Sequence, residues 1–153
     1  RGAYYKIINS IETKHKDLPV VTVSAGNHAQ GVSLTCNSLN IKHHIFLPEN
    51  TPLQKINRIK YFGKEYLTLH LHGHNFDESL AAANTFCEKN KSIFVHPFDD
   101  PDVIIGQGTV ATEIYEDIKP DIIIPPSVIF KIFKLSLTSF SLILLSKIFF
   151  INL

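Results

Sequence analysis

The sequence predicts an α/β fold in which helices flank a mostly parallel sheet. Two observations carry this prediction. Short runs of β-branched and apolar residues recur along the chain up to about residue 125, and segments with apolar residues at helical spacing separate them. Strands that alternate with helices in this way form βαβ units. In such sheets ligands bind at the carboxyl ends of the strands.

The first βαβ unit spans residues 18–47. Leu18–Val23 is expected as a strand because it is short, apolar and rich in valine. The turn Ser24–Gly26 follows, and then a helix from about His28 to Ser38. Ile41–Leu47 is the second expected strand.

The next unit begins with helix-start signals. Thr51 is expected as the N-cap and Pro52 as the first helical residue of a helix over Leu53–Phe62. Gly63 is expected to end that helix, and Tyr66–Leu71 is the third expected strand.

The later elements continue the same alternation. A helix capped by Asn75 or Asp77 is expected to run to about Asn90, and a short strand over Ser92–Val95 follows it. A helix is expected over Asp102–Ile118, with an awkward glycine-rich start at Gly106 and Gly108. An apolar strand over Asp121–Pro125 is the last expected element.

Composition excludes several classes of function. A net charge of +1 with scattered basic residues does not suit a nucleic-acid partner. Cys36 and Cys87 are too few for a disulfide scaffold, and we expect buried, reduced thiols. The chain begins at Arg1, contains no methionine and shows no leader segment, so we expect a fragment cut at its N-terminus.

The last part of the chain differs from the rest in amino-acid composition. Residues 127–153 contain no glycine, proline or acidic residue. The uncharged run between Lys134 and Lys147 is shorter than the roughly 20 residues that a bilayer span needs. We therefore expect a non-native tail here. A membrane anchor with snorkelling lysines is the alternative reading.

Residues 24–28, Ser-Ala-Gly-Asn-His, stand where the first strand gives way to a helix. Gly26 would let a ligand approach the backbone closely, and the following helix presents free N–H groups. Ser24, Asn27 and His28 add hydrogen-bonding groups. Such a turn suits a carboxylate or a phosphate, but Ser24 or Asn27 could equally serve only as a helix cap.

Several longer motifs follow one another along the chain: RGAYYKI (1–7), SAGNHAQGV (24–32), IFLPENTPLQKI (45–56), FG (62–63), HGHNFDES (72–79), HPFDDPDVIIGQGTVATEI (96–114) and KPDIIIPP (119–126). In sequence and in order these motifs resemble the threonine dehydratases, pyridoxal-phosphate enzymes of the tryptophan-synthase-β-like fold. The resemblance covers about residues 1–126.

The resemblance implies roles for residues 24–28. Ser24, Ala25, Gly26, Asn27 and His28 are expected to bind the substrate carboxylate, and Asn27 also to face the ring of pyridoxal 5'-phosphate. The expected reaction converts threonine to 2-oxobutanoate and ammonia, in the amino-acid metabolism that supplies isoleucine. The alternative is an enzyme that acts on serine. Similar serine racemases carry a catalytic serine where this chain has Ala25, which favours elimination over racemisation.

Two parts of the family's machinery are not found in the sequence. The family's cofactor-binding lysine stands two residues before the position of Arg1, so the resemblance implies no catalytic residue within this chain. Lys6 is expected to be a solvated helix residue. From Pro125 onwards the chain has PPSVIFKIFKL in place of the phosphate-binding glycine run. We therefore expect this chain to be inactive as given. A non-catalytic remnant that binds amino-acid carboxylates is the alternative from another class.

The expected organisation has four parts. Residues 1–15 belong to a large domain, 16–98 form a small domain with the carboxylate loop, 99–126 return to the large domain, and 127–153 are the divergent tail. The expected partner is a small amino-acid substrate, without nucleic acid or membrane. The complete enzyme is expected to be a homo-oligomer in the cytoplasm or an organellar matrix, and not secreted.

Other polar clusters have simpler readings. His70, His72 and His74 alternate and could reach one zinc ion, but no carboxylate or thiol completes the set, and we expect no metal. His43 and His44 should point to opposite faces of their strand. Asp99 and Asp100 suggest a turn and a helix cap rather than paired catalytic carboxylates. The run Gly106–Thr109 lacks the lysine and the spacing of a phosphate loop.

Overall fold

The computed structural model describes residues 1–13 and 18–118. Its elements, in chain order, are α1 (Gly2–Thr13), β1 (Val20–Val23), α2 (Asn27–Ser38), β2 (His43–Leu47), α3 (Leu53–Gly63), the 3-10 turn η1 (Lys64–Tyr66), β3 (Leu67–Leu71), α4 (Phe76–Asn90), β4 (Ile93–Phe94) and α5 (Pro101–Ile118).

The four described strands form one parallel sheet in the order β3-β2-β1-β4. The chain first moves from β1 through β2 to β3 and then crosses to β4 on the other side of β1. The order therefore reverses between β1 and β4, and open α/β sheets bind ligands at such a switch point, beyond the carboxyl ends of the strands. The α/β class and the parallel sheet predicted from the sequence are confirmed.

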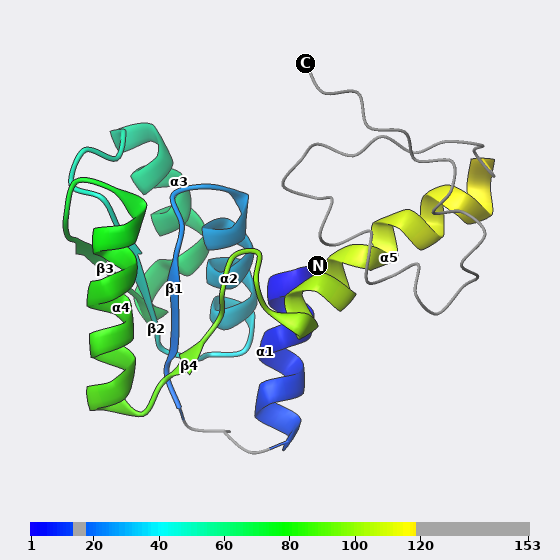
Figure 1. Cartoon of the computed structure of the whole chain (residues 1–153), viewed down its shortest axis with the longest axis horizontal. Helices are drawn as coiled ribbons and strands as arrows, with labels where there is room; N and C mark the ends of the chain where they lie inside the picture. Colours follow the sequence, from blue (N-terminus) through cyan, green and yellow to red (C-terminus); the bar gives the residue numbers. More distant parts are fainter. Residues whose placement is uncertain (14–17, 119–153) are drawn as a thin grey trace.

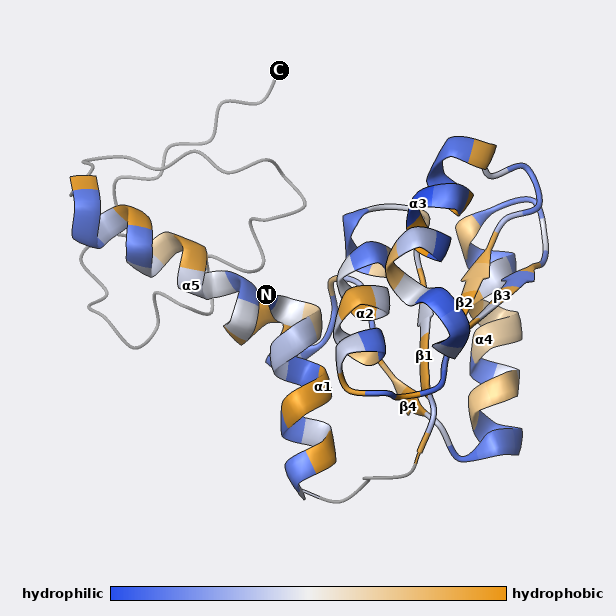
Figure 2. Cartoon of the chain, turned by 180° about the vertical axis from the view of Figure 1, so that it is seen from behind, coloured by the Kyte–Doolittle hydropathy of each residue, from blue (hydrophilic) through white to orange (hydrophobic). Residues whose placement is uncertain are grey.

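Helices cover both faces of the sheet, as Figure 1 shows. Along β1, Val20 packs in a buried cluster with residues of α1 and α2, whereas Val21 and Val23 pack against α4. The opposite facing of neighbouring residues follows from the period of two along a strand. A further cluster joins β2 to α2 and α3. The hydropathy colouring of Figure 2 shows that the strands are largely apolar along their length.

Helices α1 and α5 cross at very short range. A Cβ atom on Gly2 would lie 2.5 Å from the carbonyl oxygen of Val103, and one on Gly106 would lie 2.7 Å from Tyr5 Cβ. Only glycine allows the two backbones to approach this closely. Beyond the crossing, α5 extends away from the sheet (Figures 1 and 2). The α1–α5 pair therefore forms a tightly packed unit, which joins the buried cluster around Val20 through Ala3, Ile7 and Val103.

Three local predictions are wrong. Thr51 does not cap α3, because its hydroxyl donates to the carbonyl oxygen of Pro48. Pro52 is the N-cap residue of α3 rather than its first helical residue. Gly63 does end α3, as predicted, and the residue after it, Lys64, has the positive φ angle, 47°. The awkward start expected near Gly106 is absent, since α5 runs unbroken from Pro101. Asn75 does cap α4, as predicted, by accepting a hydrogen bond from Glu78 N.

Two expectations fall outside the described residues: the strand over Asp121–Pro125 and the tail over 127–153. Among the helices in residues 1–13 and 18–118, none combines the length and the apolar character that crossing a bilayer needs.

Candidate functional site

The loop 24–28 lies at the carboxyl end of β1, beside the switch point of the sheet. β1 ends at Val23 and α2 begins at Asn27, so three residues make the connection. Ser24 Oγ accepts a hydrogen bond from the backbone N–H of Gly26 at 3.1 Å. Gly26 is the N-cap residue of α2, and no side chain caps the helix. The reading of Ser24 or Asn27 as a simple helix cap is therefore wrong.

The first turn of α2 consequently offers N–H groups to a ligand. The N–H groups of the first turn have no carbonyl partner within a helix, and the helix dipole makes this end electropositive. Asn27 is exposed, whereas Ser24, Ala25 and Gly26 are partly buried. A Cβ atom on Gly26 would meet nothing closer than Ser24 Oγ at 4.0 Å. Open space therefore lies beside the glycine, as a carboxylate or phosphate site requires.

His28 faces the neighbouring loop rather than this open space. Its Nε2 lies 3.3 Å from the carbonyl oxygen of Val95, directly after β4. Burial lowers the pKa of His28 to about 4, and the nearby charge of His96 adds to the effect, while the hydrogen bond to Val95 opposes it. The imidazole is therefore neutral at pH 7.

The beginning of the chain lies near the same loop. The positive charge of the amino terminus contributes to the lowered pKa of His28. The Arg1 guanidinium pairs with the carboxylate of Glu113 and donates to Thr109 Oγ1 at 3.1 Å, both on α5. These contacts hold residue 1 against α5 and within electrostatic range of His28.

Lys6 is not a solvated residue, contrary to expectation. Its Nζ lies 3.1 Å from carboxylate oxygens of both Asp100 and Asp102. Partial burial lowers the pKa of Lys6, but the hydrogen bonds to the two aspartates outweigh it, and the net pKa is raised. Lys6 is therefore a protonated ion-pair residue that ties α1 to the start of α5.

Asp100 is a helix cap, as predicted. Its Oδ1 accepts the backbone N–H groups of Asp102 at 2.9 Å and Val103 at 3.2 Å. The carboxylate is buried and also pairs with Lys6. Its partners are thus all structural.

The histidines of β2 and β3 form a pair rather than a metal cluster. His44 Nδ1 lies 3.0 Å from His70 Nε2, and His44 packs on Phe86 of α4. His43, on the opposite face of β2 as predicted, is fully buried. His72 and His74 are exposed. Within the described part of the chain, no group of three or more histidine, cysteine or acidic residues is placed to hold a metal ion.

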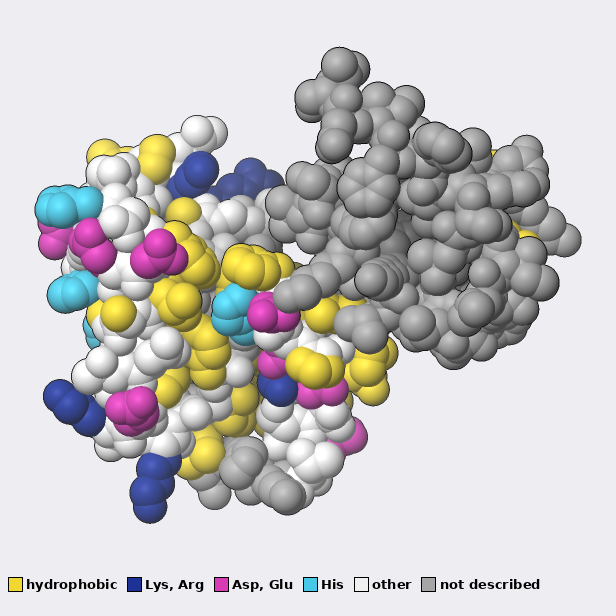
Figure 3. Space-filling model, in the orientation of Figure 1, with side chains coloured by type: hydrophobic (Ala, Val, Ile, Leu, Met, Phe, Trp, Pro, Cys, Tyr) yellow, Lys and Arg dark blue, Asp and Glu magenta, His cyan; other side chains and the backbone are white. Residues whose placement is uncertain are grey.

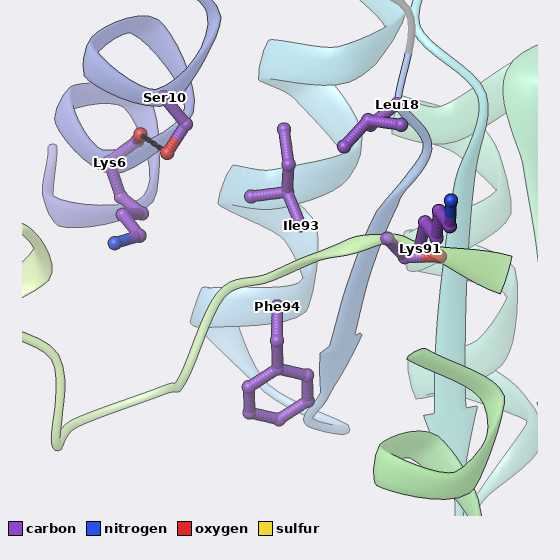
Figure 4. A pocket seen from close by; sticks show the side chains of 7 residues that line it. Lys6, Ser10, Leu18, Lys91, Ile93 and Phe94 are labelled. Atoms are coloured by element: carbon purple, nitrogen blue, oxygen red, sulfur yellow. Dashed lines mark hydrogen bonds between the residues drawn. The ribbon is translucent and has the colours of Figure 1, made fainter. Parts of the chain in front are cut away.

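An open cavity of about 620 Å³ lies elsewhere, between α1 and the outer edge of β4 (Figure 4). It is lined by Lys6, Ser10, Leu18 and Lys91–Phe94, and by none of the residues 24–28. The space-filling view shows a band of hydrophobic side chains over this part of the molecule (Figure 3). The cavity is therefore distinct from the candidate site at loop 24–28.

Comparison with known proteins places the chain in a family. Residues 1–128 match the family described as "Pyridoxal-phosphate dependent enzyme". The chain is 50% identical over 119 residues to "L-threonine dehydratase biosynthetic IlvA" of Lactococcus lactis, and 46% identical over 118 residues to the protein of the same name from Bacillus subtilis. These matches cover 78% and 77% of this chain but 28% of each relative. The chain thus spans less than a third of their length.

Solved structures agree with this assignment. The processed form of threonine deaminase isoform 2 from Solanum lycopersicum superposes with a TM-score of 0.68 at 41% identity, over 78% of this chain and 32% of that one. Maize serine racemase superposes with a TM-score of 0.66 at 27% identity, over 77% and 35%. Sequence and fold agree: the chain belongs to the pyridoxal-phosphate dependent enzyme family.

Proposed function

We propose that this chain is the part of a threonine dehydratase that binds the substrate carboxylate. The observation that carries the proposal is the uncapped first turn of α2, which stands beside open space at the switch point of the sheet. The names of relatives that are 50% and 46% identical support threonine as the substrate. Ala25 supports elimination rather than racemisation, since its methyl group cannot carry a proton to the α-carbon.

The net reaction would convert threonine into 2-oxobutanoate and ammonia, because the water lost in the elimination returns in the hydrolysis that releases ammonia. Pyridoxal phosphate supplies the electron sink that this chemistry needs. The residues of this chain would orient the substrate. The N–H groups at the start of α2 and the Ser24 hydroxyl would hold its carboxylate, which fixes the direction of the α-proton.

The described residues fit one side of the cofactor. Asn27 is exposed, and its amide would suit the hydroxyl oxygen of the cofactor ring. The phosphate needs a nest of adjacent N–H groups. The seven glycines of the chain are all separated in sequence, so we propose that the phosphate-binding glycine run lies outside this sequence.

The cofactor-binding lysine is proposed to lie outside this sequence as well. Lys6 is held by two carboxylates with a raised pKa, so its amine is protonated and engaged. The nearness of the amino terminus to His28 supports a position beside loop 24–28 for a lysine upstream of Arg1. We expect this chain alone to bind threonine without converting it.

The domain organisation remains part of the proposal. Residues 16–98 would form the small domain, and the α1–α5 unit would belong to a larger domain. Exposed Ile105, Tyr115 and Ile118 on α5 support this, since an apolar surface of this kind suits burial against further protein. We propose that the complete enzyme is a homo-oligomer in the cytoplasm or an organellar matrix.

Titration of the chain by amide NMR tests the proposal. L-threonine should shift the amide signals of residues 26–29, whereas L-threoninamide, which lacks the carboxylate, should not. Gly26→Ala is the matched variant: the fold has room for its Cβ, but the methyl group would occupy the open space beside the loop. It should weaken binding, and Gly31→Ala, which lies further along α2, should not.

Equal responses to threonine and threoninamide would contradict the carboxylate assignment. Ammonia release from threonine by this chain with pyridoxal phosphate would contradict the proposal that the lysine lies outside it. Competition between threonine and serine measures the substrate preference.

A further inference from the structure

The carbonyl oxygen of Val95 accepts two side-chain hydrogen bonds at the end of β4. Thr22 Oγ1 on β1 donates to it at 2.7 Å, and His28 Nε2 on α2 approaches it at 3.3 Å. The backbone N–H of Val95 donates to Val21 at 2.8 Å. Both β1 and α2 are therefore joined to the loop that follows β4.

This contact assigns the tautomer of His28. A carbonyl oxygen can only accept, so Nε2 must carry the hydrogen. The ring is neutral at pH 7, because burial and neighbouring positive charges lower its pKa to about 4. Nδ1 is then the unprotonated nitrogen.

The helix has few other anchors at this end. No side chain caps α2, and the backbone N–H of Gln30 reaches Gly26 O at 3.3 Å, which is a long hydrogen bond. His28 is thus the first residue of α2 whose side chain bonds to a different element. The loop that it reaches continues to Asp100, which caps α5 and pairs with Lys6.

We propose that His28 is a positioning residue: its Nε2–H holds the carbonyl of Val95 and so fixes the first turn of α2 in the orientation that binds the ligand. The imidazole itself is not the group that contacts the carboxylate, since its hydrogen is already engaged. This assignment refines the proposed function, on which its ligand-binding consequence rests. The hydrogen bond and its local effect stand independently of any ligand.

Nitrogen NMR of the histidine rings in the 153-residue chain tests the hydrogen bond directly. His28 should be found as the neutral Nε2–H tautomer at pH 7. Finding Nδ1–H, or an exchanging mixture of tautomers, would overturn the proposal.

Two variants test the positioning role. His28→Leu removes the donor, whereas His28→Gln keeps an N–H that can reach the same carbonyl. In His28→Leu the amide of Gln30 should exchange about fivefold faster, the effect of losing one ordinary hydrogen bond. The amide of Ile41, which donates to Cys36 O beyond the far end of α2, is the internal reference. His28→Gln should return the Gln30 exchange to within about twofold of the parent chain.

The outcomes separate the two proposals. If the amides of both Gln30 and Ile41 exchange faster in His28→Leu, the substitution destabilises the chain in general, and the positioning role is wrong. Threonine affinity should fall about fivefold in His28→Leu and recover in His28→Gln. If no form binds threonine while the tautomer and exchange results hold, the proposed function fails for this chain and the His28 anchor stands. If His28→Leu binds threonine as tightly as the parent chain does, the positioning role is wrong.

Discussion

His43 is a fully buried histidine on β2, and it shows how one residue can make the fold sensitive to acid. Its Nδ1 lies 3.2 Å from the carbonyl oxygen of Ile41, and its Nε2 has no hydrogen-bond partner. Burial lowers its pKa to about 4, the hydrogen bond to Ile41 raises it less, and the charge of His44 lowers it further. The folded chain therefore holds His43 in its neutral form.

The unfolded chain binds a proton at this position more readily than the folded chain. The unfolded pKa is 6.5, so the contribution of His43 to stability is complete above that pH and is lost as the pH falls towards 4. Between pH 7.5 and 4.5 the free energy of unfolding should fall by about 2–3 kcal/mol because of His43 alone. Urea unfolding of His43→Leu should show this part of the pH dependence removed.

A packing control separates the proton effect from the loss of contacts. Cys36 is equally buried but does not titrate in acid, since burial raises its pKa to about 12. Cys36→Ala should lower stability by a similar amount at both pH values. If His43→Leu keeps the full pH dependence of the parent chain, the assignment to His43 is wrong.

At the scale of elements, the end of α3 has two neighbouring positions that each favour glycine, residues 63 and 64, but only residue 63 is a glycine. A Cβ atom on Gly63 would lie 2.7 Å from Leu67 Cβ and 3.0 Å from His43 Nε2. Glycine is therefore needed inside the last turn. The next residue, Lys64, has the unfavourable backbone angles, φ 47° and ψ −135°. This combination of angles is one that a residue with a side chain rarely adopts.

Lys64→Gly should accordingly stabilise the chain by about 1 kcal/mol, because glycine adopts this conformation without strain. Lys60→Gly, in the last turn of α3, is the matched control and should destabilise the chain by about 1 kcal/mol. Thermal or urea unfolding measures both. A loss of stability in Lys64→Gly would show that Lys64 is not strained.

The crossing of α1 and α5 gives a second prediction for an element. In Gly106→Ala the new methyl group would lie 2.7 Å from Tyr5 Cβ and 3.0 Å from backbone atoms of Arg1 and Gly2. Because these atoms cannot swing away, α5 must move, and we expect a loss of about 2 kcal/mol. In Gly31→Ala the nearest atom is Ala3 Cβ at 3.7 Å, so the gain in helix propensity should leave stability equal or higher. Equal effects of the two substitutions would contradict the close crossing.

The helices and strands could be predicted from the sequence, whereas the contacts between them could not. Strand and helix order, the parallel sheet and the cap at Asn75 follow from local patterns, and the structure confirms them. The close contacts at Gly63 and the unbroken start of α5 depend on packing against other parts of the fold, which periodicity does not reveal. The same holds in the site. Loop 24–28 could be found from its residues, but the bond from His28 to Val95 joins positions 67 residues apart.

At the scale of the whole molecule, α1 closes the core on one side of the sheet. Ala3 and Ile7 are buried together with Val20, Val32 and Cys36 in one cluster. The proposed small domain begins at residue 16 and would leave α1 outside. Removing α1 would expose this side of the cluster, so the question is whether residues 16–98 keep their fold without it.

The reactivity of Cys36 answers that question. Cys36 is fully buried with a raised pKa, so in a Cys87→Ser background it should react very slowly with a thiol reagent. In the same background, deletion of residues 1–15 should make Cys36 react at least about tenfold faster, because α1 no longer covers the cluster. The far-UV circular dichroism of the deleted chain shows whether the sheet persists. An unchanged rate with an intact spectrum would mean that the small domain is independent of α1. A faster rate would mean that α1 belongs to the folding unit of the sheet.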